Sequence, residues 1–120
     1  MSGPKPWPTE IRIDRAKRAV EIDFDTGERF HLPAEYLRVV SPSAEVQGHG
    51  GTAPPPVAGK RRVTVAGADP VGNYAVRLHF DDGHDTGLYS WDLLYQLGRD
   101  QDRLWADYLK RLSAAGLSRD

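Results

Sequence analysis

Apolar and polar residues alternate most regularly in the stretch between positions 71 and 95. One set of positions is apolar at every second residue, the period of a strand with one buried face, and comprises Tyr74, Val76, Leu78 and Phe80. We expect this set to face inward with Trp91 and Leu94, and Arg77 and His79 to face the other side. The apolar residues after Gly87 predict a helix, or an extended segment followed by a helix.

The same alternation marks three shorter runs before residue 33. Isoleucines at 11 and 13 alternate with charged residues, and apolar residues do so again over 20–24 and 30–32. The segment Asp25-Thr26-Gly27-Glu28 between the last two runs has the composition of a hairpin turn. These runs predict a three-stranded antiparallel meander with one apolar face.

Helix signals follow the meander. Pro33 suits the first position of a helix, where its missing N–H costs nothing, and a short apolar stripe follows over 36–40. Ser41, Pro42 and Glu45 then predict a second short helix ending near Gly48. Residues 50–59 predict a loop, 63–65 a short strand, and 66–72 a turn. Apolar residues at helical spacing over 104–112 predict an amphipathic helix.

The fold class that follows is α+β. We expect a small single domain of antiparallel strands, a three-stranded meander plus a second strand set, with short helices and a C-terminal amphipathic helix. Residues 1–9 would form an extended leader, 10–98 the domain, and 99–120 a C-terminal helical extension.

Composition narrows the classes of function. A net charge of −1 argues against nucleic-acid and membrane-surface roles, which need a basic excess. The absence of cysteine excludes disulfides, thiolate catalysis and cysteine-ligated metal sites. No stretch approaches the ~20 apolar residues of a membrane span, and the first residues lack a signal-peptide core. We therefore expect a cytoplasmic protein.

Few residues indicate chemistry. The turn Asp81-Asp82-Gly83-His84-Asp85 gathers carboxylates around a histidine, a set that could bind a metal or transfer protons. Its alternative is a polar hairpin turn whose acids accept backbone N–H groups. His49 stands between glycines, one helical turn after Glu45. Lys60-Arg61-Arg62 is typical of a solvated strand edge, and no Ser/His/Asp triad can be assembled.

Three strings taken together carry a family resemblance: LPAEYLRVVSPSAEVQGHG, GKRRV and PVGNYAVRLHFDDGHDTGLYSWDLL. The chain resembles, over about Ile11 to Leu97, the stand-alone bacterial form of the gamma-butyrobetaine hydroxylase-like N-terminal domain, a domain of unknown function. In carnitine-pathway dioxygenases this domain holds a zinc ion through three cysteines and one histidine. By the resemblance those positions are Ser41, Ser43, Val46 and His84, so three ligands are absent and we expect no cofactor.

The function expected is that of a non-catalytic accessory or interaction module with a protein partner. Similar domains occur fused to Mrp-type ATPases, so the resemblance implies a link to iron–sulfur assembly or to dioxygenase-type partners. The alternative is a metal-binding protein that uses His84, His49, Asp82 and Asp85, and a weaker one is a small enzyme. We expect an interaction surface where the segments of the lost zinc site converge, formed by Arg38, Ser41, Ser43, Glu45, His49 and His84.

Overall fold

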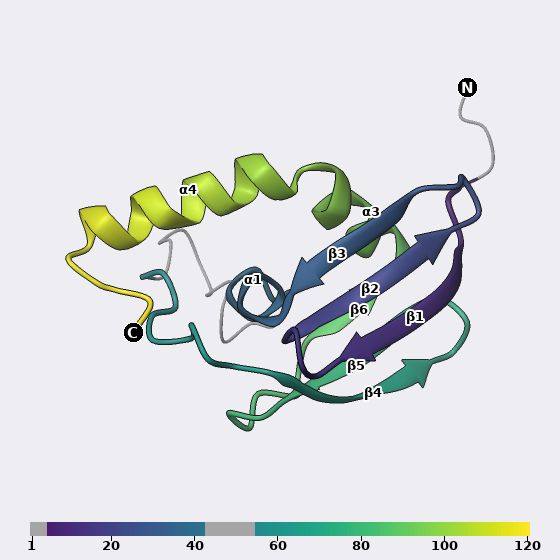
Figure 1. The fold of residues 1–120 in the computed structure, drawn as a ribbon, viewed down its shortest axis with the longest axis horizontal. Coiled ribbons are helices and arrows are strands. Elements are labelled where there is room, and N and C mark those ends of the chain that lie inside the picture. Colours follow the sequence, from purple (N-terminus) through teal and green to yellow (C-terminus); the bar gives the residue numbers. More distant parts are fainter. Residues whose placement is uncertain (1–4, 43–54) are drawn as a thin grey trace.

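The computed structural model describes residues 5–42 and 55–120, which form two three-stranded antiparallel sheets and helices (Figure 1). The first sheet has the order β1-β2-β3 and the second the order β4-β5-β6. The strands are β1 (Pro8–Asp14), β2 (Ala19–Phe24), β3 (Arg29–Pro33), β4 (Val65–Val71), β5 (Ala75–Phe80) and β6 (Leu88–Ser90). The helices are α1 (Ala34–Val39), α3 (Trp91–Arg99) and α4 (Gln101–Ala114). The α+β class predicted from the sequence is confirmed.

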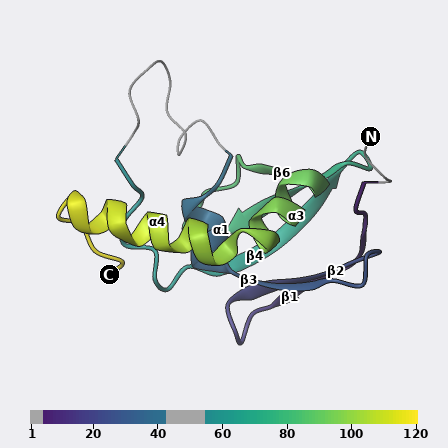
Figure 2. The same ribbon diagram turned by 90° about the horizontal axis from the view of Figure 1, so that it is seen from above.

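The first sheet is the predicted meander. Val20, Ile22 and Phe24 of the central strand β2 are buried, as the alternation requires. Gly27 closes the β2–β3 turn at a φ of 91°, a conformation that glycine adopts without steric cost. Figure 2 shows this sheet as a layer of its own, apart from the second sheet and the helices.

One core joins the two sheets. Buried side chains of β2 and β3 pack in the same cluster as those of β4, β5, β6, α1 and α3. Tyr36 and Tyr89 are the largest fully buried side chains, and each hydroxyl donates to a backbone carbonyl, of Leu97 and Leu37 respectively. A smaller cluster holds α4 against the end of α1 through Val39, Tyr108 and Leu112.

The second sheet differs from the predicted pattern at the turn of the β4–β5 hairpin. Tyr74 does not face the core, because the turn closed by Gly72 (φ of 55°) extends through it and β5 begins at Ala75. Tyr74 is 56% exposed, whereas Ala75, expected on the outer face, is buried. Val76, Leu78 and Phe80 face inward and Arg77 outward, as predicted.

Residues 66–71 form a strand, where the sequence suggested a turn. β4 pairs with β5 from Val65 to Val71, while Val63 is buried but precedes the strand. The strand was not predicted from the sequence because Gly67 and Pro70 are both unfavourable in a central strand. They are tolerated because β4 is an edge strand of the sheet, with a register shift between Val65 and Gly67.

The helices α1 and α3 differ in detail from those expected from the sequence. Pro33 is the N-cap of α1 and still pairs with Ala19 of β2, so the helix begins one residue later than expected. Beyond Gly87 the chain is extended and then helical: β6 leads into α3, whose first turn is capped by the Ser90 hydroxyl accepting from the Leu93 amide at 3.1 Å. The second predicted helix, 41–48, lies almost wholly outside the described residues. In the part of the chain that is described, no helix could cross a membrane.

Candidate functional site

The segment that follows α1 meets the turn after β5, as the resemblance led us to expect. Ser41 and His84 are 43 residues apart in sequence, and the Ser41 hydroxyl lies 3.0 Å from Nε2 of His84. Ser41 is 0% exposed and His84 5% exposed. The two side chains therefore form an internal contact between these segments rather than an open surface.

Asp82 ties three segments together beside this contact. Its carboxylate receives Nε of Arg38 at 2.8 Å, Nζ of Lys60 at 2.7 Å and the backbone N–H of His84 at 3.0 Å. Burial favours the neutral acid, but hydrogen bonds from Lys60, the His84 amide and Arg38 outweigh it and lower the pKa of Asp82 to about 2. Lys60 thus belongs to a partly buried ion pair and not to the solvated strand edge that the sequence suggested.

Close packing surrounds the same junction. A Cβ added at Gly87 would lie 2.5 Å from the Ser41 hydroxyl oxygen, so only glycine fits there. The phenol of Tyr89 is buried beside it, and burial raises the pKa of that hydroxyl. The junction of Arg38, Ser41, Asp82, His84 and Tyr89 therefore fixes the position of α1 against the second sheet.

The remaining acids of the 81–85 turn either accept a backbone hydrogen bond or lie near another histidine. Asp81 accepts the backbone N–H of Thr64 at 3.0 Å, and Asp85 lies 4.0 Å from Nδ1 of His79 rather than beside His84. Across residues 5–42 and 55–120, no group of three or more His, Cys, Asp or Glu side chains could hold a metal ion. The polar-turn interpretation is the one that these contacts support. Ser43, Glu45 and His49 lie outside the described residues.

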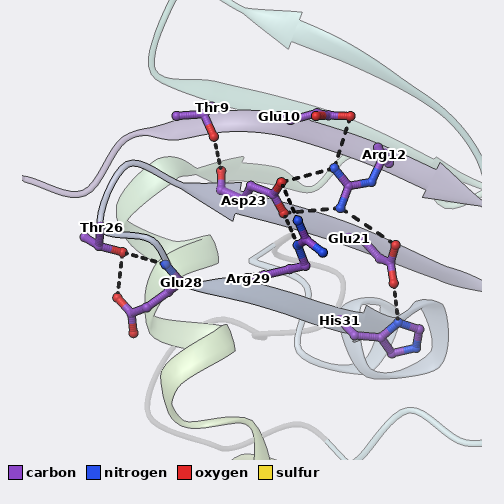
Figure 3. A network of polar contacts seen from close by, with 9 residues as sticks. All are labelled: Thr9, Glu10, Arg12, Glu21, Asp23, Thr26, Glu28, Arg29 and His31. Carbon is purple, nitrogen blue, oxygen red and sulfur yellow. Dashed lines mark hydrogen bonds and ion pairs between the residues drawn. The ribbon is translucent and has the colours of Figure 1, made fainter.

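The other two described histidines are bound to carboxylates on strand surfaces. His79 lies 2.6 Å from Asp69 across the β4–β5 pair, and His31 lies 3.2 Å from Glu21 across the β2–β3 pair. Figure 3 shows the network to which His31 belongs. At its centre Arg12 donates to both oxygens of Asp23, and Arg29 donates to the same carboxylate. The hydrogen bonds from Arg12 and Arg29 lower the pKa of Asp23.

An aromatic hollow lies at the end of the second sheet, where the sequence pattern predicted no site. It has a volume of about 260 Å³ and is lined chiefly by the rings of Trp7, Tyr74 and Trp91, with Lys5 and Asp92 at its rim. Trp7 is 48% exposed and meets Trp91 edge to face, with ring centroids 6.3 Å apart. A glycine-asparagine turn directly before Tyr74 was the signal that this ring could lie outside the strand.

Trp91 is held in place within the aromatic hollow. Its indole N–H donates to the carbonyl of Asn73 at 2.8 Å, and its backbone N–H donates to the carbonyl of Tyr74 at 3.0 Å. Lys5 and Asp92 form an ion pair of 3.2 Å at the rim. The Trp91 ring is therefore fixed by the 73–74 turn, while the rings of Trp7 and Tyr74 are exposed to solvent.

These features define a class of protein. It is a small α+β domain with two antiparallel three-stranded sheets and a polar junction between α1 and the second sheet. The sequence model of the family described as "Gamma-butyrobetaine hydroxylase-like, N-terminal" matches residues 11–95, and the chain belongs to this family. Among curated proteins, none matches the chain.

Solved structures agree with this membership. Two NMR solution structures are 48% and 51% identical to the chain, each with a TM-score of 0.82. They cover 98% and 99% of this chain, and the matches span 92% and 90% of those chains. A crystal structure from Acidithiobacillus ferrooxidans is 40% identical with a TM-score of 0.67, covering 81% of this chain and 98% of that one. Its description places it in the DUF971 family and gives its function as unknown.

Proposed function

We propose that this domain is a non-catalytic interaction module that binds a protein partner through the aromatic hollow of Trp7, Tyr74 and Trp91. The observation that carries the proposal is the exposure of Trp7 (48%) and Tyr74 (56%) around a cavity of about 260 Å³. Tryptophan and tyrosine are enriched among the residues that contribute most to protein–protein binding, because each buries a large area in one rigid group.

The construction of the hollow favours binding. Because Trp91 is fixed by its two hydrogen bonds to the 73–74 turn, a partner would not have to order it, and little side-chain entropy is lost. The rim carries one positive and one negative side chain, Lys5 and Asp92, whose charges balance. We therefore expect the occupant to be an extended apolar segment of the partner, which buries its side chains between the rings.

The polar junction supports this role by rigidity. Arg38, Ser41 and His84 belonged to the interaction surface expected from the sequence, but in the described structure their side chains lie in internal contacts. In the proposed function they hold α1 and the second sheet together, while the hollow makes the contact. A contribution from Ser43, Glu45 and His49 stays a prediction, as does a partner from iron–sulfur assembly or a dioxygenase-type system.

Affinity capture with matched baits tests the proposal. Four baits are used on an extract of cells that naturally make the protein: wild type, a Trp7→Ala/Tyr74→Ala variant, a Glu45→Gln/His49→Ala variant and a Leu109→Ala control. Leu109 is another exposed apolar residue, on α4, so its removal controls for nonspecific adhesion. Thermal melting confirms that each bait is folded.

We expect a protein that wild type and Leu109→Ala retain and that Trp7→Ala/Tyr74→Ala loses. Loss only with Glu45→Gln/His49→Ala would place the surface on the segment after α1, as the sequence analysis suggested, and would refute the aromatic hollow. Equal retention by all four baits would refute both surfaces.

A further inference from the structure

A second site is built around a carboxylate that is buried between α1 and α4. Glu35 in the first turn of α1 is only 6% exposed, and both of its oxygens accept from one guanidinium group, at 2.8 Å from Nε and 2.7 Å from Nη2 of Arg119. The same guanidinium lies over the ring of Trp105 in α4, 5.3 Å from the centroid. Paired hydrogen bonds to a carboxylate and stacking on an aromatic face are the two contacts that distinguish arginine from lysine.

Arg119 reaches this site because the last residues of the chain turn back along the body. Gly116, with a φ of 70°, follows α4, and the backbone of 118 and 119 then accepts N–H groups of Gly59 and Arg61, both at 3.0 Å. Figure 1 shows this return toward the loop that precedes β4. We call residues 117–120 the strap.

The strap is lightly attached apart from Arg119. Leu117 is 41% exposed, and no residue of the strap belongs to the buried core clusters formed by the described residues. Its anchoring contacts are three backbone hydrogen bonds, which include that of the Leu117 amide to the Leu112 carbonyl of α4, the exposed pair of Arg61 with Asp120, and the guanidinium of Arg119. An exposed ion pair of this kind contributes little.

The buried carboxylate determines what can happen when the strap leaves. A buried charge without a partner is strongly unfavourable, so the site is most stable when Glu35 keeps Arg119 or receives another cation. Room for an incoming group exists beside the pair, in a cavity of about 260 Å³ lined by Pro33, Tyr36, Gln101 and Asp102 together with Glu35 and Trp105. Asp102 adds a second carboxylate, so the cavity favours a positively charged ligand.

From these contacts we infer that Glu35 and Trp105 form a receptor for an arginine-bearing extended peptide, which Arg119 occupies within the chain and a partner's arginine can enter by exchange. The backbone N–H groups of Gly59 and Arg61 supply the hydrogen bonds that hold the peptide extended. The strap thereby competes with the partner and sets the concentration at which it binds.

A peptide exchange experiment tests the receptor in the full chain. The probe is the acetylated, amidated peptide of residues 116–120, GLSRD, and its control is the same peptide with lysine in place of arginine. The first host is the Arg119→Ala variant, in which the receptor lacks its own arginine, and binding is followed by the Trp105 indole signal in NMR spectra. A Glu35→Gln/Arg119→Ala variant removes the carboxylate as well.

We expect saturable binding of the arginine peptide to Arg119→Ala, and binding at least about 30-fold weaker when Glu35 is replaced, as when one partner of a buried charged pair is lost. The lysine peptide should also bind more weakly. Equal binding of the two peptides, or binding unaffected by Glu35→Gln, would overturn the inference.

Wild-type protein provides the second measurement if Arg119→Ala does not fold. Adding the arginine peptide at increasing concentration should shift the amide signals of 117–120 toward those of a released strap, while the lysine peptide leaves them unchanged. Strap signals that do not move at millimolar arginine peptide would contradict exchange. Because Trp7 and Tyr74 take no part, this test can fail without affecting the proposed aromatic surface.

Discussion

Replacing Gly98 by alanine separates the effect of helix propensity from that of packing. Helix propensity predicts an increase in the free energy of unfolding, whereas packing predicts a decrease. Gly98 lies inside α3 and has no left-handed backbone angle, so on propensity alone alanine would stabilise the protein by about 1 kcal/mol. In the structure, however, a Cβ at this position would lie 2.4 Å from Cγ and Cδ2 of Phe30 in β3. Such a distance forces the ring or the helix to move.

The Phe30 ring cannot move easily, since it packs edge to face with Phe24 and Tyr95, with centroids 5.8 Å away in both cases. Overpacking of this kind costs about 1–3 kcal/mol. After subtraction of the propensity gain, we expect Gly98→Ala to reduce the free energy of unfolding by up to about 2 kcal/mol. The urea midpoint should fall by up to roughly 1 M.

Equilibrium urea unfolding of four proteins measures the effect: wild type, Gly98→Ala, Phe30→Leu and the double variant. Leucine is smaller than phenylalanine, so the double variant should lose less stability than the sum of the two single changes. A higher midpoint for Gly98→Ala, or strictly additive losses, would refute the close contact between α3 and β3.

Three further predictions concern the core, the junction and metal content. Leu78→Ala should cost about 2–5 kcal/mol, and Arg77→Ala should stay within about 0.5 kcal/mol, by urea unfolding; equal losses would mean that the register of β5 is shifted by one residue. Because the folded-state pKa of Asp82 is about 2, below the usual 3.8, its contribution to stability is present above about pH 4 and is lost as the pH falls toward 2. The deficit of Asp82→Asn relative to wild type should therefore be larger at pH 7 than at pH 2.5, and a deficit that does not change with pH would contradict the ion pairs. Elemental analysis of dialysed protein should find no stoichiometric zinc, and a chelator should not unfold it; one zinc per chain would overturn that expectation.

The sequence predicted those elements in which one face is buried along the whole length, because apolar and polar residues then alternate regularly. The alternation through Val20, Ile22 and Phe24 identified β2 because one face of that strand is buried throughout its length. Tyr74 continued the same period in sequence, but the turn closed by Gly72 takes it out of the strand. Edge strand β4 has no such period, since its pairing with β5 and not an apolar face holds it in place.

The candidate sites were predictable only in part, because their residues are far apart in the sequence. The meeting of Ser41 with His84 could be expected because the family resemblance placed both segments at one site. The aromatic hollow joins residues near positions 7, 74 and 91, and the Glu35–Arg119 pair spans 84 residues, so neither leaves a local pattern in the sequence. Each requires knowledge of how the two sheets, the leader and the strap lie in space.

Site-specific photocrosslinking reports whether a protein partner contacts the aromatic hollow. A photoreactive phenylalanine analogue is placed at Tyr74, or at Leu109 as the control, and the full chain is irradiated in cells that naturally make the protein. Both positions are exposed, so both variants should fold. We expect a discrete crosslinked partner from position 74 that is absent from position 109 and that disappears when Trp7 is also replaced by alanine. A partner that crosslinks equally from both positions, or one that wild type captures but position 74 never reaches, would contradict this expectation.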